Sequence, residues 1–258
     1  MKTQLLPKIC LVAACAALPV AADTAALSPE HDSYVRKDNA TGNSYGGETK
    51  FFVGYASATA IARALLTFDL STIPDNATIT TAALSIWQTG DDGSSTNADM
   101  TISVFDLGST LSTETPSWTS AAMGNFDVAS ATVLSTATLR ARPAQSGGYG
   151  LPHEVTFDST ADFVAAIQAA YESGAQAITL VLAITSPAEG GSGRYWAQFD
   201  STEAATANIP SLALGYTVAA VPEPATTALF LGLLGLAGFL VHTKGTKGFS
   251  KVTKFPIL

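Results

Sequence analysis

The central part of this 258-residue chain has no cysteine and few basic residues. Both cysteines, Cys10 and Cys15, lie close to the N-terminus, so the remainder can form no disulfide, use no thiol nucleophile and bind no zinc through thiolates. Residues 23–224 contain 7 Lys and Arg against 21 Asp and Glu, a net charge of 7 − 21 = −14. This balance argues against nucleic acid or an anionic lipid surface as a partner.

Histidine is also scarce in this central part, where only His31 and His153 occur. Neither stands at a spacing typical of a Ser–His pair or a metal site, and His31 beside Asp32 is more typical of a strand edge. The pair Asp91-Asp92 could in principle serve acid–base hydrolysis. Its Gly- and Ser-rich surroundings favour a solvated turn instead. We therefore expect no enzyme.

The C-terminal end has three parts: Val221-Pro222-Glu223-Pro224, an uncharged apolar run over 225–241, and a tail over 242–258 with four Lys and no acid. As a helix, the run would be about 26 Å long at about 1.5 Å per residue, which is close to the bilayer core of about 30 Å. The alternative is a buried core helix. Because positive charge is retained in the cytoplasm, the pattern predicts a transmembrane helix with the tail inside.

This three-part pattern resembles the PEP-CTERM sorting signal of exopolysaccharide-producing Gram-negative bacteria. The resemblance implies that exosortase, a membrane-embedded protease, cuts near the Pro-Glu-Pro triplet and passes the protein to the cell surface or the extracellular matrix. The tail is longer than usual for that family and carries Lys in place of Arg. We expect the membrane anchor to be transient.

The N-terminus has the features of a secretory signal peptide over 1–22. Lys2 and Lys8 precede an apolar stretch over 9–20, and small residues at Val20-Ala21-Ala22 predict cleavage after Ala22. Val12-Ala13-Ala14-Cys15 offers an alternative, a lipoprotein box, but the apolar stretch between Lys8 and this box is short for that purpose. The chain is therefore expected to cross the inner membrane.

Residues 23–218 are expected to form one domain of many short strands, followed by a linker over 219–224. Period-two alternation is clear at Leu84–Trp87 and at Met100–Val104. One helix is expected after a cap at Ser159 or Thr160, ending at Gly174. The expected strands are 33–37, 49–55, 62–70, 79–88, 100–107, 132–139, 153–157, 177–185, 194–199 and 211–218.

Residues 30–217 also resemble the DNRLRE domain, which is similar to a domain of archaeal disaggregatases and to modules attached to polysaccharide lyases. The segments that carry the resemblance are His31-Asp32-Ser33-Tyr34-Val35-Arg36, Asn43-Ser44-Tyr45-Gly46-Gly47, Arg63-Ala64-Leu65-Leu66-Thr67-Phe68-Asp69-Leu70 and Ile209-Pro210-Ser211-Leu212. The resemblance implies a jelly-roll β-sandwich, and some relatives bind carbohydrate. The Arg-rich late motif of that family is reduced here to Arg194.

Carbohydrate contact requires aromatic faces with polar groups around them. The Tyr and Trp residues that could provide such faces are Tyr34, Tyr45, Tyr55, Trp87, Trp118, Tyr149 and Trp196. We expect exposed rings to stack on sugars, with basic residues on consecutive strands beside them. The candidate glycan-binding residues are Tyr34, Arg36, Tyr45, Lys50, Arg63 and Trp118. The alternative for the rings is a place in the core, and Arg63 would then pair with Asp69 or Asp32.

Calcium is the one cofactor that the acidic residues suggest. Asp91, Asp92, Asn97 and Asp99 cluster in one loop, and calcium binds six to eight oxygens from such side chains and from carbonyls. Their spacing fits no defined calcium loop, so the alternative is a solvated loop.

The sequence thus predicts an all-β protein, a jelly-roll-like antiparallel β-sandwich with one short helix, plus a C-terminal transmembrane helix. The favoured function is a secreted, non-catalytic surface protein that adheres to or organises extracellular polysaccharide. The alternatives are a purely structural envelope or matrix protein with no specific ligand and, less favoured, a polysaccharide-active enzyme.

Overall fold

A computed structural model of the chain describes residues 21–39, 45–111, 116–145, 147–205 and 207–219. All ten expected strands are confirmed, with ends shifted by three residues or fewer, and an N-terminal strand is added to them. The strands are β1 (Ala21–Leu27), β2 (His31–Arg36), β3 (Lys50–Tyr55), β4 (Ile61–Asp69), β5 (Ala77–Gly90), β6 (Asp99–Asp106), β7 (Ser135–Arg140), β8 (His153–Phe157), β9 (Ala177–Ser186), β10 (Tyr195–Asp200) and β11 (Ser211–Val218).

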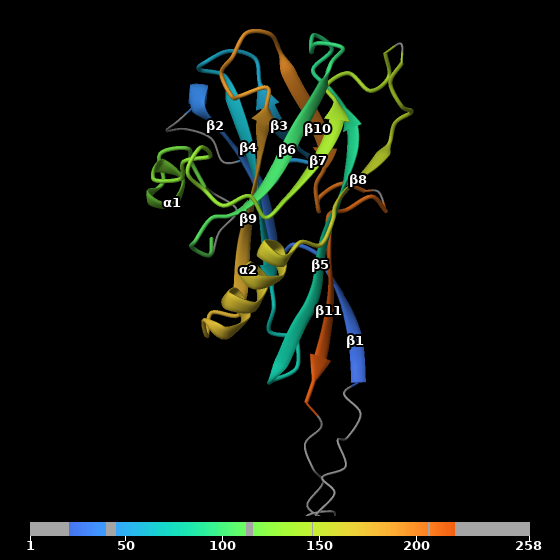
Figure 1. Cartoon of the computed structure of the whole chain (residues 1–258). Coiled ribbons are helices and arrows are strands. Elements are labelled where there is room, and N and C mark those ends of the chain that lie inside the picture. The colour runs from blue at the N-terminus through green and yellow to red at the C-terminus, as the bar shows by residue number, and fades with distance from the viewer. Residues whose placement is uncertain (1–20, 40–44, 112–115, 146, 206, 220–258) are drawn as a thin grey trace, which may run out of the picture. The chain divides into compact units, whose positions relative to one another are not determined.

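The eleven strands form one antiparallel hydrogen-bonded sheet, which curls back on itself as a half-barrel (Figure 1). The main path is β1-β11-β5-β10-β3-β4-β9-β6-β7, with β2 also paired to β4 and β8 also paired to β5. The expectation of an all-β, antiparallel architecture is therefore confirmed.

The sheet consists of two halves that meet at the hairpin between β3 and β4. Strand β3 pairs with β4 only through Gly54↔Ala62 and Tyr55↔Ile61, and from Ala64 onward β4 pairs with β9 instead. The first half contains β1, β11, β5, β8, β10 and β3, and the second contains β2, β4, β9, β6 and β7. This short joint allows the inner faces of the two halves to enclose a core.

The main core lies between these inner faces. Phe51, Leu84 and Phe199 from the first half belong to the same buried cluster as Leu66 and Leu180 from the second half. The alternation seen in the sequence explains the arrangement, because Leu84 and Ile86 point inward while Ser85 and Trp87 lie half-buried on the outer face.

A second, smaller core covers the outer face of the second half. Leu65, Phe105 and Val181 pack there against Met123 and Phe126, which belong to the segment between β6 and β7. That segment contains the short helix α1 (Ala121–Gly124), which the sequence did not predict. Because both faces of β9 are covered, all its residues from Ile178 to Ile184 are buried.

The expected helix is α2 (Ala161–Glu172), which connects β8 and β9 and lies beside β5 and β9 (Figure 1). Thr160 caps its N-terminus, where the side chain accepts a hydrogen bond from the Phe163 backbone N–H. Phe163, Ile167 and Tyr171 form the buried face, and the Tyr171 hydroxyl donates to the Pro74 carbonyl at 2.6 Å. The remaining short element is a 3-10 turn, η1 (Lys37–Asn39).

Several expectations concern residues outside the described ranges. These are the signal peptide up to Val20, the Val221-Pro222-Glu223-Pro224 motif, and the segments 225–241 and 242–258. In the described part of the chain, no helix is both long and apolar enough to cross a membrane. Strand β1 begins at Ala21, so the expected cleavage after Ala22 falls inside this strand.

Candidate functional site

Three of the candidate glycan-binding residues come together beside the hairpin that joins the two halves. The Tyr34 and Tyr45 rings stack with their centroids 4.2 Å apart and an interplanar angle of 16°. Asn39 donates from its side-chain amide to the Tyr45 hydroxyl at 2.9 Å. The Phe52 and Tyr34 rings form a T-shaped contact, with their centroids 5.3 Å apart. Tyr34 is only 6% exposed, so the expectation of an exposed stacking ring at this position is wrong.

Arg36 extends from the end of β2 toward Trp196 on β10. Its guanidinium carbon lies 5.6 Å from the centre of the indole ring. The Phe52 ring is tilted by 38° against the same indole, with the ring centroids 5.8 Å apart. Asp38 fixes the guanidinium with two hydrogen bonds of 3.0 and 2.6 Å. These bonds, more than the surrounding charges, raise the pKa of Arg36 above its ordinary value.

A groove of about 340 Å³ opens next to this arginine, and we call it the Arg36–Trp196 groove. Its lining combines apolar side chains with hydrogen-bond donors from two arginines and one amide. The lining residues are Arg36, Phe52, Ala56, Ala60, Asp91, Asp92, Arg194, Trp196 and Gln198. Trp196 is 6% exposed and belongs to the main buried cluster. Arg36 lies over its ring, so a sugar could stack on that face of the indole only after Arg36 moves. Hydrogen bonds from the lining donors require no such movement.

The charges around the groove are balanced in pairs. Arg36 pairs with Asp38 and Arg194 pairs with Asp92, while Arg142 lies 4.0 Å from Asp91. Burial opposes ionisation of Asp92, but hydrogen bonds from Arg194, Ser94 and Ser95 outweigh it, so the pKa of Asp92 lies below its usual range. Asp92 is therefore an ionised acceptor at neutral pH.

Tyr34 supports the groove as a neutral hydroxyl. Burial, together with the neighbouring Tyr45 and Glu48, raises the pKa of Tyr34 to about 12. The stacked pair and Phe52 hold the wall of the groove through packing and carry no charge of their own.

The structure places the other candidate glycan-binding residues elsewhere. Lys50 starts β3 opposite Asp200, at the far end of the strand from Gly54. Arg63 is buried and makes a bidentate contact with Glu189, with nitrogen–oxygen distances of 3.1 and 2.6 Å. The expected pairing of Arg63 with Asp69 or Asp32 is therefore wrong.

Trp118 contacts Arg63 and does not line the groove. The guanidinium carbon of Arg63 lies 4.6 Å from the Trp118 ring centre and 5.5 Å from that of Phe126. The guanidinium also donates to the Phe126 carbonyl at 3.3 Å. These contacts fasten the segment between β6 and β7 to the outer face of β4.

Each of the four candidate calcium ligands lies close to an arginine side chain. Asp91 and Asp92 line the groove, while Asp99 lies 3.5 Å from Arg140, which also donates to the Asn97 side chain at 3.4 Å. Among the described residues, no three or more His, Cys, Asp or Glu side chains gather closely enough to hold a metal ion. Calcium binding stays a prediction.

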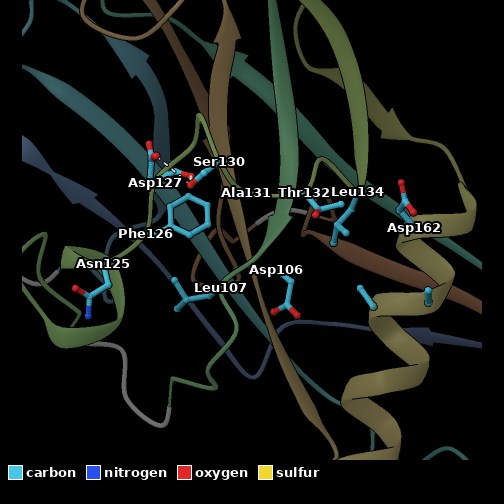
Figure 2. A pocket seen from close by; sticks show the side chains of 12 residues that line it. Asp106, Leu107, Asn125, Phe126, Asp127, Ser130, Ala131, Thr132, Leu134 and Asp162 are labelled. Atoms are coloured by element: carbon cyan, nitrogen blue, oxygen red, sulfur yellow. Dashed lines mark hydrogen bonds between the residues drawn. The ribbon is translucent and has the colours of Figure 1, made fainter.

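A second hollow, of about 530 Å³, lies between the end of β6, the segment after α1, and α2 (Figure 2). Asp106, Asp127 and Asp162 lie around it, and Phe126 is its one aromatic residue. Asp106 accepts from the Gly108 N–H at 2.9 Å, and Asp127 accepts from the Ser130 hydroxyl at 3.0 Å. Two of the three carboxylates thus serve local turns, and no arginine lines this hollow, in contrast to the Arg36–Trp196 groove.

Sequence reasoning included Arg36 but left Phe52, Arg194, Trp196 and Gln198 outside the candidate site. Period-two alternation contained part of the signal, because Trp196 and Gln198 point to the opposite side of β10 from Ala197 and Phe199. Arg194 comes immediately before that strand. Nothing local indicated that β3 would place Phe52 beside Trp196.

Comparison with known protein families gives two matches. Residues 23–216 match the model of carbohydrate-binding module family 96, and residues 220–244 match the PEP-CTERM protein-sorting motif. The comparison does not name the DNRLRE domain, so that resemblance stays a prediction. No curated protein matches the chain significantly.

The sorting match confirms the expected PEP-CTERM signal, which marks exported proteins for exosortase and for the cell surface of Gram-negative bacteria. The first match covers well over half of the chain and includes both the groove and the whole core. Families of carbohydrate-binding modules are in general non-catalytic. The chain belongs to carbohydrate-binding module family 96 and carries a PEP-CTERM sorting motif.

Proposed function

We propose that this protein is a non-catalytic surface protein that binds extracellular polysaccharide in the Arg36–Trp196 groove. The observation that carries the proposal is that the donors Arg36, Arg194 and Gln198 line one groove together with the apolar side chains Phe52 and Trp196. Carbohydrate sites combine such apolar side chains with a few fixed polar groups. The curled sheet is, in this proposal, a variant of the jelly-roll β-sandwich.

The charge balance favours a neutral glycan over an acidic one. Each arginine at the groove already has a carboxylate partner, and residues 23–224 carry a net charge of −14. An acidic polysaccharide would meet long-range repulsion at low salt. Binding of such a chain would therefore require bridging Ca²⁺.

The absence of catalysis is part of the proposal and follows from the groove's own groups. Hydrolysis of a glycosidic bond by two carboxyl groups requires one that keeps a proton at working pH. Asp92 is held ionised by Arg194, and Asp91 lies beside Arg142. Asp92 therefore suits hydrogen-bond acceptance better than proton transfer.

The sorting motif explains how the binding domain reaches its ligand. Exosortase would cut near Val221-Pro222-Glu223-Pro224 after export, where the prolines keep the backbone extended and open to a protease. The apolar run over 225–241 would hold the protein in the membrane until then. The released domain would join the extracellular matrix.

The test is binding of the exported protein to a glycan array, followed by calorimetry on any positive glycan. Neutral and uronic-acid polysaccharides should be compared with and without a chelator. Arg194→Ala should weaken binding about 10- to 100-fold, because a hydrogen bond to a charged group is worth about 1.5–3 kcal/mol. Trp196→Ala should also weaken binding, because Trp196 lines the groove and contacts Arg36.

Trp87→Ala is the matched control, because Trp87 lies half-buried on the outer face of β5 and does not line the groove. Its affinity should stay within about twofold. Equal losses in Trp87→Ala and Trp196→Ala would reject the groove as the site. Binding to no glycan would favour a purely structural matrix protein, and turnover of a glycan would favour an enzyme.

A further inference from the structure

Strand β1 is attached to the domain by one neighbour. It pairs with β11 from Ala21↔Val218 to Leu27↔Leu212, and no other pairing of β1 occurs among the described residues. Figure 1 shows β1 at the outer edge of the first half, next to β11. Main-chain hydrogen bonds are therefore the principal attachment of this strand.

The side chains of β1 contribute little to its position. Ala22, Asp23, Thr24 and Ala26 are exposed, and only Ala25 and Leu27 pack, half-buried, against the main core. A strand whose side chains are mostly exposed is weakly specified by packing. The same strand from another copy of the chain would fit β11 equally well.

The pairing of β1 with β11 joins the two ends of the domain, so we expect it to form late. Ala21 and Val218 are separated by 218 − 21 = 197 residues, and β11 is the final strand to be made. Long-range pairings are slow because the closure of a long loop is costly. During this delay β1 is free, and the β11 edge leaves Leu212 and Leu214 of the core beside an empty strand position.

The connection to the rest of the domain is short and stiff. Only Ser28, Pro29 and Glu30 separate β1 from β2, and the Glu30 N–H is already bound to the Thr67 carbonyl at 2.7 Å. Pro29 restricts its own φ angle and keeps Ser28 extended. Short, stiff hinges favour exchange of an element between copies.

We propose that β1 is an exchangeable strand, which pairs with β11 of a second copy of this chain and so links neighbouring copies at the cell surface. Even if the signal peptide is cut after Ala22, five of the paired residues, Asp23–Leu27, remain. The partner is the same protein, and the interface is the β1–β11 ladder with its strands supplied by two chains. The proposal is independent of glycan binding.

The lack of cysteine after Cys15 allows a direct test. Ala26 and Ala213 are both exposed and lie opposite each other in the ladder, at a separation that a disulfide can bridge. Full-length Ala26→Cys and Ala213→Cys chains with different tags should be co-expressed, exported and oxidised. We expect a disulfide-linked pair of the two tagged chains, at a yield several-fold above that of an out-of-register cysteine pair.

The matched control combines Thr24→Cys with Ala213→Cys. Thr24 lies opposite Gly215, one step out of register on the same face, at a diagonal distance too long for a disulfide. Similar yields in both combinations would show random collision and overturn the proposal. Exclusive intrachain linkage in the Ala26→Cys/Ala213→Cys double variant, with no product from the mixed single variants, would also overturn it.

A variant with a longer connection between β1 and β2 provides a second test of strand exchange. Insertion of four Gly/Ser residues between Ser28 and Pro29 lets β1 fold back easily on its own β11. This insertion should lower the interchain yield while leaving the intrachain disulfide of the double variant intact. An unchanged interchain yield would contradict strand exchange.

Discussion

The arginines of this domain all form ion pairs with carboxylates. Each of its five arginines lies within 4.0 Å of a carboxylate, and the pairs are Arg36–Asp38, Arg63–Glu189, Arg140–Asp99, Arg142–Asp91 and Arg194–Asp92. The value of such a pair depends on its burial, because water screens an exposed pair and leaves side-chain entropy as the main cost. In a buried pair, removal of one partner leaves the other charge unpaired in the low-dielectric interior of the protein.

Glu189→Ala should therefore lower the free energy of unfolding by about 3–5 kcal/mol, which is the usual cost of leaving one member of a buried ion pair without its partner. The Arg63 and Glu189 side chains are only 10% and 11% exposed. Asp38→Ala is the control, since the Arg36 and Asp38 side chains are 33% and 32% exposed, and it should cost about 0–1 kcal/mol. Urea denaturation measures both, and equal effects would contradict the assigned role of Arg63.

Asp32 is a buried carboxyl group next to a second one. It is 2% exposed and accepts from the Thr202 N–H at 2.7 Å, while burial and, less strongly, Glu203 raise its pKa to about 6 from an ordinary 3.8. The folded state holds this proton more tightly than the unfolded state. Its contribution to stability is therefore largest below about pH 4, falls as the pH rises to about 6, and is then constant.

Asp32→Asn should remove this pH dependence. Relative to the parent chain, the variant should gain up to about 3 kcal/mol at pH 7 and little at pH 3.5, because one pKa unit corresponds to about 1.4 kcal/mol. Urea denaturation across this range measures the difference. Asp75→Asn on an exposed turn is the control and should change stability by less than about 0.5 kcal/mol. A gain at pH 3.5 equal to that at pH 7 would show an effect unrelated to proton binding.

At the scale of elements, the short β3–β4 joint determines how the sheet curls. Gly54 has a φ of 133° and faces the backbone of β10 across the pairing Trp196↔Gly54. A Cβ at Gly54 would collide with the Tyr195 carbonyl. Only glycine allows this φ and this close approach together.

Gly54→Ala should thus lower the free energy of unfolding by more than about 3 kcal/mol, the sum of backbone strain and steric displacement. It should also weaken glycan binding, since β3 and β10 carry Phe52 and Trp196 of the groove lining. Gly47→Ala is the control, because a Cβ there meets no atom within 4 Å. Thermal unfolding followed by circular dichroism measures both. A mild effect at Gly54 would mean that the joint can relax.

At the scale of the whole molecule, the domain has its own complete core. Among the described residues, the main buried cluster draws its fully buried members from Tyr34 to Tyr216. We expect residues 23–220 alone to unfold cooperatively in urea and to give a strand-dominated circular dichroism spectrum with a minor helical part. A spectrum of disordered chain would show that the fold depends on the missing ends.

Processing is the second property at this scale. In a host with exosortase, mass spectrometry of the surface protein should find peptides up to about Val221 and none from Ala225 onward. The control is the same chain in a host without exosortase, where the C-terminal peptides should remain. Intact C-terminal peptides on mature surface protein of the first host would reject processing at this motif.

The sequence predicted the elements well because their signals are local. Alternation at Leu84–Trp87 located one of the strands, and Thr160 marked the start of α2. Strand β1 was missed because Ala21 and Ala22 were assigned to the signal peptide, and its small side chains give no alternation. The sorting motif was recognised because its three parts are consecutive in the chain.

The sequence alone determined the all-β class, helix α2, the sorting motif and the shortage of basic charge, since each depends on neighbouring residues or on composition. Only the tertiary structure decided which side chains meet. Arg36 is 160 residues from Trp196 in the chain, yet its guanidinium lies over that ring; Arg63, similar in sequence context, is buried with Glu189. Strand order and the turn at Gly54 set these contacts, and neither is encoded within a few residues of the side chains that they bring together.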